Sequence, residues 1–106
     1  MNYKIDTTPR FEKDVKKLKK KFPKIKDDLV KFINELSINP ELGVNLGDKI
    51  FKVRIPNSSI PTGKSGGFRI ITYYKREDII FLVTIYSKTE QDNILTNRLR
   101  EIIKEL

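Results

Sequence analysis

Two cationic side chains flank a pair of glycines in the segment Lys64-Ser-Gly-Gly-Phe-Arg69, and an apolar run follows it. Glycine lets backbone N–H groups approach an anion closely, so a basic hairpin of this kind can hold phosphate. The segment is not a nucleotide-binding P-loop, because the first glycine of that motif is missing and no helix follows. An ordinary hairpin loop is the alternative interpretation of the same residues.

A second group of cations lies upstream in Phe51-Lys-Val-Arg-Ile55, where apolar and basic residues alternate. Alternate side chains of a strand point to opposite faces, so Lys52 and Arg54 are expected on one face. Arg69 begins the next apolar run, where a cation must extend to the surface, pair with a carboxylate or bind an anion. Exposed strand faces often carry Lys and Arg for solubility alone, and that alternative stays open.

Three further residues could serve the same chemistry. Lys88 follows the last apolar stretch, next to a predicted helix whose amino terminus would favour an anion. Tyr73 and Tyr86 could donate protons or stack on bases, although most strand tyrosines only pack. The predicted catalytic residues are therefore Lys52, Arg54, Arg69 and Lys88, and the predicted substrate-binding residues are Lys64, Tyr73 and Tyr86.

The composition restricts how such a site could work. The chain has no His and no Cys, and its acidic residues are scattered, which disfavours imidazole catalysis, a Cys-based metal site and a two-metal site. The mechanism that the composition still allows is electrostatic stabilisation of a phosphorane by fixed cations, without a metal or other cofactor. The net charge of +8 indicates a polyanionic or acidic partner, or else a Lys-rich solubility surface.

The 106 residues are expected to form one domain, spanning 1–106. Hydrophobic periodicity and turn residues predict a strand at 3–6, a helix after Thr8-Pro9, a helix from Ile25 to Asn39-Pro40, a loop at 41–49, strands at 50–55, 68–74 and 79–87, and a helix opened by a capping box at 87–90. This order predicts an α+β fold, in which about four strands form a mainly antiparallel sheet with a helical hairpin on one face and the final helix beside the other.

The sequence shows no apolar segment long enough to span a membrane and no signal-peptide pattern at its amino terminus. The expectation is therefore a cytoplasmic protein.

These residues, in this order, resemble the RelE/ParE toxin superfamily of bacterial toxin–antitoxin modules, and most closely the RelE and HigB-like mRNA interferases. The resemblance covers nearly the whole chain and rests on the helical hairpin and the stretches 51–55, 63–71 and 82–88. It implies a RelE-like fold and a ribosome-dependent endoribonuclease that cleaves mRNA through attack by its 2′-hydroxyl. It also implies the ribosome, mRNA and a cognate antitoxin as partners.

The resemblance also assigns roles to individual positions. Lys52, Arg54 and Arg69 match the basic catalytic positions of the RelE branch. Lys64 matches the basic hairpin of the HigB-like branch, and Lys88 matches the lysine that ends the last strand.

The chain departs from RelE proper at two positions. RelE proper has an arginine just after the strand-ending lysine and a proton-transferring tyrosine in the last helix, where this chain has Thr89 and Leu95. Tyr86 or Lys88 would then have to move the proton. Two alternatives stay open: a ParE-like toxin that inhibits a DNA topoisomerase by binding, and a degenerate toxin that only binds its antitoxin. The ParE branch tends to lack the basic strand face, which favours the nuclease.

Overall fold

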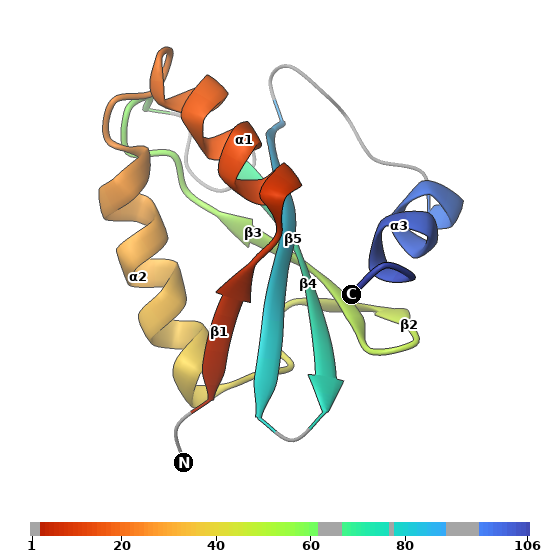
Figure 1. Cartoon of the computed structure of the whole chain (residues 1–106). Helices are drawn as coiled ribbons and strands as arrows, with labels where there is room; N and C mark the ends of the chain where they lie inside the picture. The colour runs from red at the N-terminus through yellow and green to blue at the C-terminus, as the bar shows by residue number, and fades with distance from the viewer. Residues whose placement is uncertain (1–2, 62–66, 77, 89–95) are drawn as a thin grey trace.

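A twisted sheet occupies the middle of the molecule, flanked by helices on both faces (Figure 1). The computed structural model describes residues 3–61, 67–76, 78–88 and 96–106. Within them the sheet has five strands in the order β1-β5-β4-β3-β2. The strands are β1 (Lys4–Thr7), β2 (Val44–Gly47), β3 (Ile50–Ile55), β4 (Phe68–Arg76) and β5 (Ile79–Ser87). The helices are α1 (Pro9–Lys19), α2 (Ile25–Ile38) and α3 (Thr96–Ile103).

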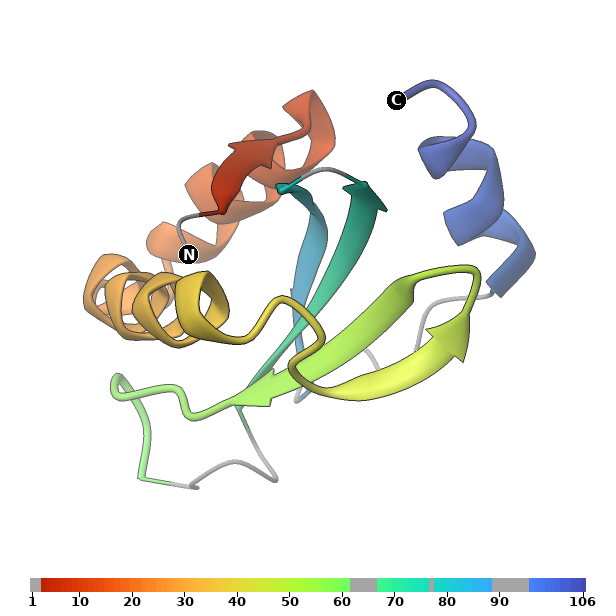
Figure 2. The same cartoon turned by 90° about the horizontal axis from the view of Figure 1, so that it is seen from below.

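The helices bury two apolar clusters, one on each face of the sheet. The larger cluster joins the stripes of α1 and α2 to the strand residues Val53, Ile55, Phe68, Ile70, Leu82 and Ile85. The smaller cluster joins Leu99, Ile102 and Ile103 of α3 to Ile50, Ile71 and Val83 on the opposite face. Figure 2 shows the helical hairpin and α3 on opposite sides of the sheet. The second cluster involves fewer strand residues, so part of this face is left for polar side chains.

The predicted fold class is confirmed, including the mainly antiparallel sheet: only β1, against β5, pairs in parallel among the described strands. The predicted loop at 41–49 is wrong, because Val44–Gly47 form β2 against β3. This strand is four residues long and mostly exposed, so its hydrophobic pattern is weak. The turn that follows has positive φ at Asp48 and Lys49 rather than at the usual Asn-Gly pair, which concealed the hairpin.

The predicted start of the last helix is also revised. Ser87, the first residue of the expected capping box, is the buried last residue of β5. The described part of α3 begins at Thr96, and Glu90 lies outside the described residues. None of the helices in the described part of the chain combines the length and the apolar character needed to cross a membrane.

The predicted start of α1 is confirmed and ties this helix to the sheet. Thr8 caps the helix, because its Oγ1 accepts a hydrogen bond from the Phe11 N–H at 3.0 Å, and Pro9 follows in the first turn. The same hydroxyl donates to the Val83 carbonyl oxygen at 2.7 Å. One turn later, Asp14 Oδ2 accepts from Thr84 Oγ1 at 2.6 Å. These bonds set the position of the helical hairpin on β5.

Replacing Thr8 by Ala removes both bonds of a buried hydroxyl and should lower the free energy of unfolding by about 1–3 kcal/mol. Urea denaturation would measure the loss. Thr8→Ser keeps the hydroxyl and should retain most of the stability. Equal stability of the Ala and Ser variants would show that the cap does not hold α1.

Candidate nucleic-acid interface

Three neighbouring strands place one candidate residue each in a single row. Arg54 of β3 lies directly opposite Arg69 of β4, and Arg69 lies directly opposite Tyr86 of β5. Directly opposed residues in an antiparallel sheet share a face and have Cβ atoms about 5 Å apart. Two guanidinium groups and a phenol therefore lie side by side across the sheet.

Lys52 extends this row along β3. It lies two residues before Arg54, hence on the same strand face about 7 Å away, and opposite Ile71. Lys52 is half-buried and Arg54 is exposed. Within the described part of the chain, neither side chain has a carboxylate within salt-bridge distance. Val53 and Ile55, which alternate with these two cations along β3, lie in the core cluster under the helical hairpin. Lys52 and Arg54 are therefore on the face away from the hairpin, as predicted.

Arg69 is a buried cation, with only 4% of its surface exposed. Its Nη1 donates a hydrogen bond to the Phe68 carbonyl oxygen at 3.3 Å. Burial lowers the pKa of Arg69, the neighbouring Arg54 charge lowers it further, and Tyr86 acts in the opposite direction. A guanidinium still keeps its charge at neutral pH. Two adjacent positive groups, one of them poorly hydrated, make this part of the sheet attractive to an anion such as phosphate.

Tyr86 is also buried, with 6% of its surface exposed. Burial raises the pKa of the Tyr86 phenol, and the Arg69 charge opposes that rise. The phenol is therefore protonated at neutral pH. It can donate a hydrogen bond, or a proton, to a group held by Arg69.

Lys88 lies at the same end of the sheet. Its backbone N–H donates to the Gly67 carbonyl oxygen at 2.9 Å, which extends the β4–β5 pairing by one residue. Gly67 also packs against β3, since a Cβ atom at this position would collide with the Ile55 carbonyl oxygen. Gly67 is thus required for the close approach of strand ends that bring Arg54, Arg69 and Lys88 together.

The segment after β3 is anchored by α2. Asp28 Oδ2 accepts a hydrogen bond from the Ser58 N–H at 3.0 Å, and Asn57 Oδ1 accepts from the Ser59 N–H at 3.0 Å. Both Asp28 and Asn57 are buried. Sequence reasoning missed them as positioning residues. The Asn-Ser-Ser run indicated a turn, but nothing local indicated that a carboxylate thirty positions earlier would hold it.

The remaining candidates are not brought into this row. Tyr73 lies opposite Ile50 and Phe81, at the other end of the paired strands, and packs in the α3 cluster. Its geometry is that of a packing residue. Lys64 lies outside the described residues, as do Thr89 and Leu95.

Comparison with known proteins identifies the family. The family model for the RelE toxin of the RelE/RelB toxin–antitoxin system matches residues 8–106. The chain belongs to the RelE toxin family. A search of curated proteins gave no match.

A solved structure shows the fold of the same family. The chain is similar to a free-state double mutant of the E. coli toxin RelE, with 16% identity and a TM-score of 0.65. The similarity covers 100% of this chain and 99% of that one. It confirms the predicted RelE-like fold, including the hairpin and the final helix.

The raised pKa of Tyr86 predicts a measurable titration. The phenol should ionise only above the ordinary tyrosine value of 10.0, as seen in the difference in tyrosinate absorbance between wild type and Tyr86→Phe. Because the folded state favours the protonated phenol, the associated stability is complete below that value and is lost as pH rises through the folded-state pKa. Ionisation of Tyr86 below the ordinary value would contradict its burial beside β4.

Proposed function

We propose that this RelE-family chain is the toxin of a toxin–antitoxin module and cleaves mRNA on the ribosome without a metal ion. The observation that supports this proposal most strongly is the row of Arg54, Arg69 and Tyr86, with Lys52 beside it. The row combines positive charge with a protonated phenol on one sheet face. A breaking phosphodiester develops negative charge and its leaving oxygen needs a proton, and this row could supply for both.

The proposed reaction uses the RNA's own nucleophile. The 2′-hydroxyl loses its proton to water, and its oxygen forms a bond to the adjacent phosphorus. The resulting phosphorane carries extra negative charge, which fixed cations stabilise more strongly than they stabilise the starting diester. The bond to the 5′-oxygen then breaks and that oxygen takes up a proton, leaving a cyclic phosphate and a 5′-hydroxyl end.

The residues would divide these tasks by position. Arg54 and Arg69 would bind the scissile phosphate, and the poor hydration of Arg69 would strengthen its effect on the phosphorane. Lys52 would contact the same phosphate from along β3. Tyr86 or Lys88 would supply the proton to the leaving oxygen, and Lys64 would hold a neighbouring phosphate. Tyr73, a predicted substrate-binding residue, has no role in this proposal because it lies at the other end of the paired strands.

The ribosome would supply what the chain lacks. A chain without His lacks the most common general base, so more of the rate has to come from other sources. Alignment of the 2′-oxygen with the phosphorus on the ribosome would be one such source, and it can contribute as much to the rate as charge does. The helical hairpin carries many lysines that could bind ribosomal RNA through its phosphates. They are Lys13, Lys16, Lys17, Lys19, Lys20, Lys21, Lys24 and Lys26.

The same proposal includes a protein partner. A toxin of this class would be kept inactive in the cytoplasm by a cognate antitoxin encoded beside it. Because the toxin carries a net charge of +8, that antitoxin is expected to be acidic.

Cleavage of a reporter mRNA in a translating extract tests the site. Arg54→Ala and Arg69→Ala should each lower the cleavage rate by roughly 10²–10³-fold, because each removes a charge from the phosphorane. Lys52→Ala should lower the rate less, since Lys52 lies farther along the strand. Tyr86→Phe and Lys88→Ala test the two candidate proton donors. The variant that lacks the actual donor should show the larger fall in cleavage rate.

Two controls make the result specific. Lys31→Ala and Lys75→Ala remove exposed cations from α2 and from the far part of β4, and should cleave like wild type. Circular dichroism should show an intact fold in every variant. Undiminished cleavage by the combined Lys52, Arg54 and Arg69 variant would exclude this site. Growth arrest without mRNA cleavage would favour a ParE-like binding toxin, and the absence of both would favour a degenerate toxin.

A further inference from the structure

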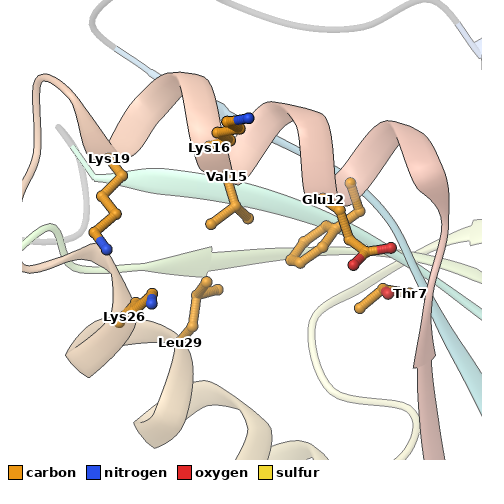
Figure 3. Close-up of a pocket in the computed structure, with 8 residues that line it drawn as sticks. Thr7, Glu12, Val15, Lys16, Lys19, Lys26 and Leu29 are labelled. Carbon is orange, nitrogen blue, oxygen red and sulfur yellow. The ribbon is translucent and has the colours of Figure 1, made fainter.

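A groove lies between α1 and α2 (Figure 3). It is on the hairpin face of the sheet, whereas Lys52, Arg54 and Arg69, here called the cation row, lie on the other face. Its volume is about 410 Å³. Its lining mixes apolar residues with charged ones. The lining residues are Thr7, Phe11, Glu12, Val15, Lys16, Lys19, Lys26 and Leu29.

The floor of this groove is apolar. Phe11 and Leu29 belong to the core cluster beneath the hairpin, and Val15 packs against that cluster while remaining partly exposed. The two helices therefore do not close completely over their own core. An apolar side chain placed in the groove would gain contact with this floor.

Two lysines from different helices meet at one end of the groove. Figure 3 shows the amino groups of Lys19 and Lys26 side by side, with Glu12 and Thr7 at the other end. The proximity of Lys26 lowers the pKa of Lys19. A carboxylate between the two amino groups would replace this repulsion with two attractions. Lys16, one turn before Lys19, adds a third cation to the lining.

The combination of apolar floor and cationic end distinguishes between ligand classes. An RNA backbone could use the lysines, but its bases would find no open aromatic face on the floor, because Phe11 is buried and Val15 and Leu29 are aliphatic. A peptide that carries an acidic residue beside apolar ones satisfies both parts of the groove. The groove therefore fits a protein segment better than it fits a nucleic acid.

We propose that the α1–α2 groove docks an acidic amphipathic segment of the antitoxin, with a carboxylate between Lys19 and Lys26 and an apolar side chain on the floor. This inference rests on the proposed function, because it takes the antitoxin as the partner. It specifies the surface to which the antitoxin binds and the groups that it contacts there. The contact lies on the hairpin, so it holds the toxin without occupying the cation row on the other sheet face.

Charge reversal in the full-length chain tests the docking site against the antitoxin encoded beside it. Lys19→Glu combined with Lys26→Glu should weaken binding by at least roughly tenfold, because two attractions become repulsions. Lys20→Glu combined with Lys31→Glu makes the same change in net charge, at the C-cap of α1 and on α2. Those two residues are exposed and do not line the groove, so affinity should change little. Calorimetry at two salt concentrations measures both variants.

A second readout locates the contact directly. Acetylation of exposed lysines in the complex should spare Lys19 and Lys26 relative to Lys31. Equal affinities of the two double variants, together with equal acetylation, would overturn the docking site but leave the nuclease proposal intact. Failure of the wild-type chain to bind the co-encoded protein would overturn the antitoxin proposal itself. Weaker ribosome binding with unchanged antitoxin affinity would assign the lysines to RNA and overturn the docking site.

Discussion

The alignment of β3 with β4 is the constraint on which the candidate site depends. This register sets Arg54 directly against Arg69, and like charges in directly opposed positions destabilise a sheet. The pairing is maintained by the backbone ladder and by the apolar residues on the reverse face, including Val53, Ile55 and Ile70. A slip of one residue would turn Arg54 toward that core and expose its apolar neighbours. The hydrophobic core therefore fixes the arrangement of the cations.

Arg69 shows how far the fold departs from what stability alone would favour. Burying a guanidinium beside a second cation costs free energy. The surrounding structure compensates locally: the Phe68 carbonyl accepts a hydrogen bond from the guanidinium, and Gly67 permits tight packing against Ile55. A cation that the fold holds at such a cost in free energy is expected at a functional site.

Local sequence signals predicted most of the elements but few of the contacts between them. Thr8-Pro9 and the helical periodicity predicted the hairpin, and the alternation at 51–55 placed Lys52 and Arg54 on the correct face. The strand at Val44–Gly47 escaped because it is short, exposed and closed by a turn of unusual composition.

Contacts between distant residues could not be inferred from one sequence. The cross-strand row depends on register, and register depends on packing over the whole sheet. The link from Asp28 to Ser58 depends on where α2 begins relative to the end of β3. Likewise, Lys19 and Lys26 belong to separate helices, and their meeting depends on how the two helices pack.

The surroundings of the cations carry more functional information than their number does. In the sheet, the cations lie beside a buried phenol and a backbone that keeps them close, which suits a compact group whose charge increases during a reaction. In the hairpin, the cations lie beside an exposed part of the core, which suits a ligand with both a charge and an apolar group. A net charge of +8 alone would favour any polyanion. The charge is instead divided between two chemically different surfaces, the sheet face and the hairpin groove. This division is why we propose two kinds of partner, an RNA and a protein, for one small chain.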